Sequence, residues 1–593
     1  MEEERISDEV AAAVGKRHLT ILIKDVDLVN VFTGEIYPTS IGIYRNRIVN
    51  IGKDAEKLNA RLVIDGSGKT AIPGLIDTHL HIESTMLTPA NFASAVLPHG
   101  TTTVVADPHE IGNVLGKAGV RMMLDNGKGL PLRVFFYAPT CVPECSAVTS
   151  GAEITPADVE EMLGWDGIAG LGEVMDFPGV LSGDGKMMSI LEAGRRNKAV
   201  IDGHAVFLTG NDLNAYVTAG PEADHENFNP ASVIEKLRSG MYVKLRGPTI
   251  LNVKAMVSAL NELPKPWNII FVTDDIMPDN LLKMGHLDFV CRNYIQAGMD
   301  PVEVVRAATW RPAQHMHFFD LGAIAPGKIA DIVLLDKLEK FNVDTVIANG
   351  ALVAKGGRLA AEFSKQPFDS RARNTVKVKQ LSVDDFQVKP PIRNGRIKVN
   401  VIDFTQSLGE MGDVGLAFLE SVLTRLEQAE LEVRDGNYVM GDLATAFVFE
   451  RHGRSGSRGL AFVRSLIRKG AVASTVAHDA HNLVILGTNP KDMLAAAQAV
   501  TKQGGGVAAV KDGRLLALIE LPLAGIMSDE EIQAVGGKMA KLRRAFAELG
   551  LLDHPYMPLI SLLTLAVVPH VRITDKGLFD VDHQQYVNTL VAD

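Results

Sequence analysis

The strongest constraint in this 593-residue sequence is a strand that ends in two histidines, His79 and His81. The apolar run at residues 71–76 predicts a buried β-strand that leads directly into them. Side chains two positions apart in a strand point to the same face, so both imidazoles can reach one metal ion. The alternative is a strand end with two polar residues that hold no metal. Asp77 and Glu83 lie beside the pair, and we therefore favour a metal site.

Short apolar runs alternate with helix-like stretches between residues 71 and 320, which is the pattern of βα units around a parallel sheet. Eight runs stand out, at residues 71–77, 102–106, 133–137, 168–173, 199–203, 215–219, 241–245 and 268–273. The sixth is ambiguous, because residues 215–219 could equally end a helix that starts at Asn211. Eight strands in about 200 residues predict a (β/α)8, TIM-like barrel.

The segments on either side of this predicted barrel at residues 71–320 have a different texture. Residues 1–70 and 321–360 both contain short strands separated by turns, and we expect them to form one flanking β-sandwich domain. A polar, proline-containing stretch at residues 361–395 predicts a linker. Residues 396–593 predict an independent C-terminal α/β domain. The predicted fold class of the whole chain is therefore α/β.

Composition and charge exclude several classes of function. The net charge of −11 argues against nucleic-acid binding, which needs clustered positive charge. No apolar run approaches the roughly 18 residues of a membrane span, and residues 1–5, Met-Glu-Glu-Glu-Arg, lack the pattern of a signal peptide. Three cysteines in a chain of this length do not make a disulfide framework, so we expect a cytoplasmic protein.

Reactive groups in a barrel of this kind sit at the carboxyl ends of the strands, and the residues found there share one chemistry. Four histidines and two acids follow or end the predicted strands: His79, His81, Glu173, His204, His225 and Asp274. Imidazole nitrogens and carboxylate oxygens bind divalent ions at about 2.0–2.2 Å. A carboxylate such as Glu173 has two oxygens and can bridge two ions. Zinc, manganese and iron(II) all suit these ligands.

The same order of residues resembles the amidohydrolase superfamily, and within it the bacterial adenine deaminases over nearly the whole chain. The motifs that carry the resemblance are His79-Leu-His-Ile-Glu-Ser84, Asp107-Pro-His-Glu-Ile111, Gly172-Glu-Val-Met175, Asp202-Gly-His204 and Asp274-Asp275, with Glu450-Arg-His452 and residues 476–482, 504–506 and 523–528 near the C-terminus. The C-terminal motifs are the more specific, because amidohydrolases in general lack them. One departure is Leu245-Arg-Gly-Pro248, which lacks the acid expected soon after the arginine.

This resemblance implies metal-dependent, hydrolytic deamination of adenine to hypoxanthine and ammonia, with two divalent ions (Mn, Fe(II) or Zn) per subunit. It implies that Asp274 binds a metal and moves the proton of the attacking water. Glu173 or Glu83 would protonate the purine ring, although Glu83 could equally only orient a loop. Asp275 and Glu226 are the predicted substrate-binding residues. We expect a small purine base as the partner, neither nucleic acid nor membrane, and a homo-oligomer.

Two other functions remain open at this stage. An amidohydrolase that acts on a cyclic amide or an N-acyl compound would use the same barrel. A non-catalytic scaffold would have the same fold but missing ligands, whereas all six candidate ligands are present here. Residues 107–110 are expected to orient the histidines. His478 and His481 have the spacing for a further metal site, but a hydrogen-bonded turn is the slightly favoured interpretation.

Overall fold

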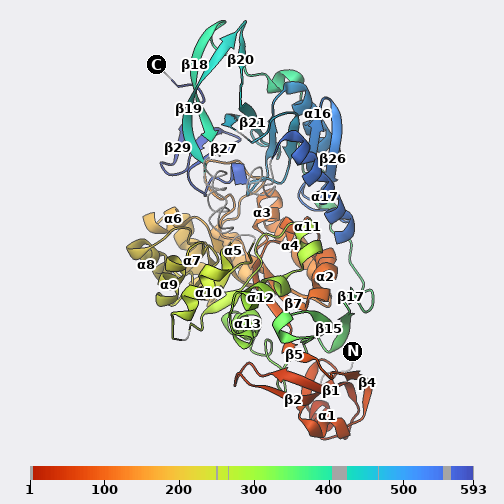
Figure 1. The fold of residues 1–593 in the computed structure, drawn as a ribbon. Coiled ribbons are helices and arrows are strands. Elements are labelled where there is room, and N and C mark those ends of the chain that lie inside the picture. The colour runs from red at the N-terminus through yellow and green to blue at the C-terminus, as the bar shows by residue number, and fades with distance from the viewer. Residues whose placement is uncertain are drawn as a thin grey trace.

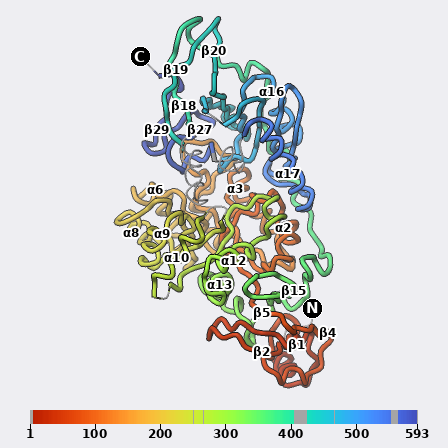
Figure 2. The backbone as a smooth tube through the Cα atoms, viewed as in Figure 1, coloured from red at the N-terminus to blue at the C-terminus, as the bar shows by residue number. Residues whose placement is uncertain are grey.

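The computed structural model describes residues 5–248, 251–264, 266–403, 424–464, 466–551 and 562–591, so most of the N-terminal stretch considered above lies outside it. Three regions follow one another along the molecule, with the N-terminal strands at one end and the C-terminal sheet at the other (Figure 1). The two ends of the chain are correspondingly far apart (Figure 2). None of the helices in the described part of the chain combines the length and apolar character that a bilayer crossing requires.

Strands from two distant segments form one flanking sheet. Its nine members are β1 (Leu19–Val29), β2 (Ile36–Tyr44), β3 (Arg47–Ile51), β4 (Ala60–Asp65), β5 (Thr70–Pro73), β14 (Ile332–Leu335), β15 (Val343–Ala348), β16 (Ala351–Lys355) and β17 (Arg358–Leu359). Strand β5 joins the segments, because it pairs in parallel with β1 and antiparallel with β14. Buried isoleucine, leucine and valine side chains from both segments share one core cluster on this sheet.

The single strand predicted at residues 71–77 is two strands in the structure. Strand β5 belongs to the flanking sheet and β6 (Leu75–Leu80) to the central region, with Gly74 between them. The two regions approach closely here, because the Gly74 amide donates to the Asp331 carbonyl oxygen at 2.9 Å. A Cβ atom on Gly74 would lie 2.2 Å from Thr102 Oγ1. A side chain at this position therefore has no room.

Eight parallel strands build the central region. They are β6, β7 (Thr101–Ala106), β8 (Arg133–Ala138), β9 (Ile168–Val174), β10 (Val200–Gly203), β11 (Ala223–Asp224), β12 (Tyr242–Leu245) and β13 (Ile269–Phe271). Strands β6–β10 form a five-stranded sheet and β11–β13 a three-stranded one. Backbone hydrogen bonds cross both seams, from Glu222 N to Ile201 O and from Asp274 N to His79 O, each at 3.0 Å.

Helices separate the central strands, which gives a mixed α/β fold (Figure 1). They include α2 (Pro89–Val96), α3 (His109–Leu115), α4 (Lys117–Gly127), α5 (Pro156–Leu163), α6 (Phe177–Ser182), α7 (Gly185–Asn197), α8 (Gly210–Ala219), α9 (Pro230–Arg238), α10 (Val253–Asn261) and α11 (Pro278–Met284). The predicted sixth strand at residues 215–219 is wrong, because this segment ends α8. Only Leu213 and Tyr216 of that helix are buried, and their spacing of three is that of one helix face. The sixth strand is β11.

The C-terminal region is built on a second nine-stranded sheet. Its order is β20-β19-β18-β22-β21-β24-β23-β25-β26, with β18 (Gly395–Asp403), β19 (Arg425–Arg434), β20 (Asn437–Val439), β21 (Leu443–Phe449), β22 (Arg458–Arg464), β23 (Ala471–Ser474), β24 (Leu483–Gly487), β25 (Gly506–Lys511) and β26 (Arg514–Glu520). Helices α16 (Pro490–Lys502) and α17 (Ile532–Leu549) pack on it, and α17 extends beside α2 and α11 (Figure 1). Arg543 of α17 binds Asp279 of α11 at 3.0 Å, which ties the regions together.

We predict that Gly74→Ala lowers the thermal midpoint of unfolding. The new Cβ would overlap Thr102, and relief of that overlap should reduce the free energy of unfolding by about 1–3 kcal/mol. Gly537→Ala in α17 is the matched control, because no described atom beyond the adjoining backbone of its own helix lies within 4 Å of its Cβ position. Alanine there should leave the midpoint unchanged or raise it slightly. Equal midpoints for the two variants in scanning calorimetry would contradict the close approach.

Candidate metal centre and substrate pocket

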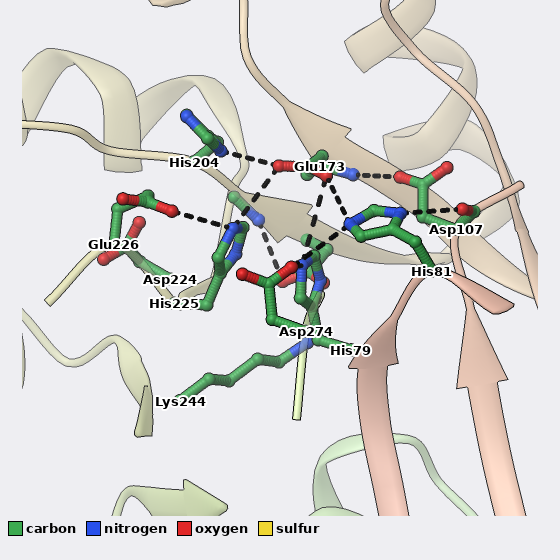
Figure 3. Close-up of polar contacts among 12 residues, drawn as sticks. His79, His81, Asp107, Glu173, His204, Asp224, His225, Glu226, Lys244 and Asp274 are labelled. Atoms are coloured by element: carbon green, nitrogen blue, oxygen red, sulfur yellow. Dashed lines mark hydrogen bonds and ion pairs between the residues drawn. The ribbon is translucent and has the colours of Figure 1, made fainter. Parts of the chain in front are cut away.

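The carboxyl ends of the parallel strands bring all six predicted ligands into one cluster (Figure 3). His79 lies in β6 and Glu173 lies in β9. The other four come just after a strand: His81 after β6, His204 after β10, His225 after β11 and Asp274 shortly after β13. None of the six is more than 9% exposed. The cluster is therefore buried among donor atoms that bind divalent metals.

The carboxylate of Glu173 lies at the centre of the cluster. Its Oε1 atom is 3.3 Å from His81 Nε2 and 4.0 Å from His79 Nε2. Its Oε2 atom is 2.6 Å from His204 Nδ1 and 3.4 Å from His225 Nε2. The two oxygens thus face different histidines (Figure 3), and His109 Nδ1 also lies 3.6 Å from Oε1. A carboxylate in this position can contribute one oxygen to each of two ligand sets.

Asp274 also faces His79 and His81. Its Oδ1 atom is 3.4 Å from His79 Nε2 and 3.3 Å from His81 Nε2, and its Oδ2 atom accepts a hydrogen bond from Arg246. The residue has a φ of 56°, so a left-handed turn directs its carboxylate back towards the strand ends. Burial alone would raise the pKa of Asp274, but the Arg246 guanidinium and the neighbouring imidazoles hold it well below its usual value.

The donor atoms in this cluster fit a metal better than a closed hydrogen-bond network. His79 Nε2, which faces both Glu173 and Asp274, is buried and finds no hydrogen-bond partner among the described residues. Two sets of three donors lie within 4.8 Å of one another: His79 with Glu173 and His225, and His79 with His81 and Asp274. Buried polar atoms without partners are costly. The chain therefore has a buried, histidine-rich candidate metal site.

Carboxylate and carbonyl groups behind the histidines orient their rings. His79 Nδ1 lies 2.8 Å from Asp202 Oδ2, and His81 Nδ1 lies 3.0 Å from the carbonyl oxygen of Asp107. A carbonyl oxygen only accepts, so Nδ1 of His81 carries the proton and Nε2 is free to bind a metal. Lys244 Nζ donates to the same Asp202 oxygen at 2.7 Å. The buried aspartate is thereby neutralised by a buried lysine.

A pocket opens beside the cluster, between the central and C-terminal regions. Its apolar wall includes Met175, Val206, Phe207, Phe228, Leu565 and Val568, and its polar wall includes His109, Glu110, Glu226, Arg246, Asp275, His478 and Asp479. The predicted substrate-binding residues therefore both line it. Burial would raise the pKa of Glu226, but Arg246, at 3.2 Å, lowers it to about 2. Burial and the adjacent Asp274 instead raise the pKa of Asp275.

Glu83 is buried behind this pocket and is not among the described residues that line it. Its Oε1 atom accepts a hydrogen bond from the Ile111 amide at 3.3 Å. Burial raises the pKa of Glu83 to about 7, and the negative charge of Glu110 adds to this effect. Glu83 can therefore hold a proton near neutral pH, but it does not directly face the pocket.

The sequence reasoning missed the buried cations that balance the acids. Lys236 donates to Asp224 Oδ2 at 2.6 Å, and Lys244 binds Asp202 as described above. Lys244 interrupts the apolar run at residues 241–245, and a lysine inside such a run indicates a buried charge that needs an acidic partner. The contributions of Leu565 and Val568 had no comparable signal, because they come from a separate region of the chain.

Comparisons with known proteins relate both halves of the chain to one family. Residues 70–353 match the profile described as "Amidohydrolase family", and residues 421–585 match "Adenine deaminase C-terminal domain". A protein of Moorella thermoacetica named adenine deaminase is 40% identical over 96% of this chain and 96% of its own length. An adenine deaminase of Thermosipho africanus is 38% identical over 99% of this chain and 100% of its own. Among solved structures, a β-aspartyl dipeptidase from Fervidobacterium islandicum has a TM-score of 0.44 and 18% identity, covering 58% of this chain and 99% of that one.

We predict that Lys244→Met destabilises the protein strongly. The change leaves the Asp202 carboxylate buried beside His79 without its lysine, and loss of one partner of a buried ion pair costs about 3–5 kcal/mol. Lys128→Met is the control, because Lys128 and Asp125 form a pair in which both side chains are more than half exposed. The free energy of unfolding of that variant should lie within about 0.5 kcal/mol of the wild-type value. Similar thermal midpoints for the two variants would contradict the proposed role of Lys244.

Proposed function

The chain belongs to the adenine deaminase family of the amidohydrolases, and we propose that it hydrolyses adenine to hypoxanthine and ammonia. The position of Glu173 supports this function most directly, because its two oxygens face different histidines on the wall of the pocket. The match of the C-terminal region to a domain specific to adenine deaminases supports the choice of substrate. The function does not rest on the barrel alone, since related barrels carry many reactions.

Two divalent ions, Mn, Fe(II) or Zn, are proposed as the cofactors. The residues that would hold them are His79, His81, Glu173, His204, His225 and Asp274. When bound, such ions supply hydroxide at neutral pH by lowering the pKa of water to about 7. Two observations support these ligands: His79 Nε2 is buried without a hydrogen-bond partner among the described residues, and the other donors surround the Glu173 and Asp274 carboxylates.

The overall reaction adds the oxygen of water to C6 of adenine and breaks the bond from C6 to the amino nitrogen. One proton of the water ends on the departing ammonia and the other on ring atom N1. We assign the transfer to ammonia to Asp274, whose Oδ1 faces the cluster. Arg246 holds the other oxygen of that carboxylate, so Asp274 is oriented for transfer from one atom only.

The proton for N1 has two candidate donors. Glu173 lines the pocket, but imidazoles surround both of its oxygens. Burial gives Glu83 a pKa of about 7, but Glu83 is not among the described residues that line the pocket. Glu83 is therefore a donor only if water or another side chain relays the proton.

Recognition of the purine is assigned to the acids and aromatic rings of the pocket. Asp275 and Glu226 present carboxylate oxygens, which can accept hydrogen bonds from the N–H groups of adenine. Phe207 and Phe228, with ring centroids 6.1 Å apart, form an apolar face suited to a flat base. Arg246 orients both Glu226 and Asp274, and so it links recognition of the substrate to proton transfer.

We further propose that strands β6–β13 form a (β/α)8 barrel, supported by their parallel pairing and by the hydrogen bonds across both seams. The domains proposed from the sequence are the barrel at residues 71–320, a flanking β-sandwich at residues 1–70 and 321–360, a linker at 361–395 and the C-terminal domain at 396–593, but β5 belongs to the flanking sheet and moves the start of the proposed barrel beyond residue 73. Residues 74 and 331 mark the junction between the first two, where the chain passes from one sheet to the other.

Glu173→Gln should reduce kcat/KM for adenine at least about 10³-fold, because it removes the charge that would be shared by the two ligand sets. Ammonia release from adenine by protein supplied with Mn²⁺ or Zn²⁺ measures this. His583→Gln is the control, because His583 is exposed and lies far along the chain in the C-terminal region. Ring opening of a hydantoin by the wild type, without adenine turnover, would instead favour a cyclic amidase.

Glu83→Gln separates the two roles of Glu83. If Glu83 is the proton donor, the variant should show a kcat about 10²–10⁴-fold lower than the wild type, while its metal content and thermal midpoint stay unchanged. If Glu83 only orients its loop, kcat should stay within a few-fold of the wild type, because the glutamine Oε1 can still accept the hydrogen bond from the Ile111 amide. Parallel measurement of kcat, metal content and unfolding distinguishes the outcomes, and unchanged kcat excludes Glu83 as the donor.

A further inference from the structure

A second cluster of chelating side chains joins the central region to the C-terminal region. His109 and Glu110 come from the start of α3, and His478, Asp479 and His481 come from the segment between β23 and β24. All five are at most 4% exposed. Four of them also line the pocket, on the side that the C-terminal region covers. The function proposed above uses none of these five residues as a ligand or a catalyst.

Three residues of this cluster, His109, Glu110 and Asp479, offer donor atoms within 4.8 Å of one another, and His478 lies close to two of them. Glu110 Oε1 is 2.9 Å from His478 Nδ1, and Asp479 Oδ1 is 3.3 Å from the same nitrogen. His109 Nε2 is 3.7 Å from Asp479 Oδ1 and 3.8 Å from Glu110 Oε1. Donors at about 2.1 Å from an ion in a tetrahedral arrangement lie about 3.4 Å apart. The four observed separations lie on both sides of this value.

Hydrogen bonding does not account for these short approaches. Glu110 Oε1 has no hydrogen-bond partner among the residues described, even though His478 Nδ1 is within 2.9 Å. The two atoms are close but lack the direction of a hydrogen bond. A buried carboxylate oxygen in this state is expected to bind a cation that the chain itself does not supply.

The neighbouring groups leave the donor atoms available. His481 Nε2 contacts the other oxygen of Glu110, Oε2, and the amide of Ala477 donates to His481 Nδ1 at 3.2 Å. Nδ1 of His481 is therefore engaged, and its Nε2 packs against Glu110 Oε2, which leaves Oε1 of that carboxylate for an ion. One divalent ion would also neutralise the charges of Glu110 and Asp479.

We propose that His109, Glu110, His478 and Asp479 form a further binding site for a divalent transition-metal ion, with His481 as a positioning residue. Two imidazoles and two carboxylates suit zinc, and manganese or iron(II) also accept these ligands. The ion would connect α3 of the central region to the segment after β23 at the wall of the pocket. Its binding would stabilise the contact between the regions, because only the folded chain brings the four donors together.

The metal content of a double variant tests this site directly. His478→Gln combined with Asp479→Asn removes two donors but keeps side chains of similar size. Wild type and variant are saturated with Zn²⁺, passed through a desalting column and analysed by mass spectrometry. We expect the variant to hold about one ion per chain fewer than the wild type. Metal content unchanged within error would overturn the proposal.

His315→Gln is the matched control. His315 is also a buried histidine, and it lies in α14 (Trp310–His315), outside both clusters. Its variant should retain the metal content of the wild type. The comparison does not depend on adenine turnover, so a failure of the proposed reaction and a failure of this site give different results. A wild type that does not turn over adenine, but holds about one ion more than the double variant, would count only against the deaminase assignment.

Crystals of the wild type provide a second test if the double variant does not fold. Zn²⁺-loaded crystals measured on both sides of the zinc absorption edge should give an anomalous peak about 2.0–2.2 Å from His109 Nε2, Glu110 Oε1, His478 Nδ1 and Asp479 Oδ1. Absence of this peak in crystals with strong peaks beside Glu173 would overturn the proposal, and a peak at the expected position would support it.

Discussion

Compensation of buried charge at the carboxyl ends of the parallel strands is the constraint on which the site depends. Five acids gather there with almost no exposure: Glu173, Asp202, Asp224, Glu226 and Asp274. Lys236, Lys244 and Arg246 are buried with them and bind four of the five, Asp202, Asp224, Glu226 and Asp274. Glu173 is left to the imidazoles alone. The one carboxylate without a protein cation is therefore the one best placed to bind metal ions.

The C-terminal region completes the pocket and does more than cover it. Apolar side chains of residues 565 and 568 form part of the wall, and residues 478 and 479 bring charged groups next to α3. Water is thereby excluded from the side of the pocket opposite the strand ends, which strengthens the electrostatic interactions inside it. A chain without this region would lack the contacts that His478 and His481 make with Glu110.

Local patterns predicted much of the site, because strand ends and metal ligands leave marks in the sequence. The pair His79 and His81 was readable from the spacing of two, and the acids at 173 and 274 from their place after apolar runs. The sixth strand was not, because β11 has only two residues and is too short to produce an alternating pattern. Gly74 likewise broke one predicted strand into two, and only the packing of two sheets reveals why.

The sequence by itself determined the identities of the donor atoms and the order of the strands that carry them. Tertiary structure alone decided which oxygen of Glu173 faces which histidines, and which cation neutralises each acid. It also brought His109 and Glu110 against His478 and Asp479, more than 350 positions away in the chain. The physical reason is that ligand geometry depends on distances of a few ångströms between segments whose separation along the chain carries no such information.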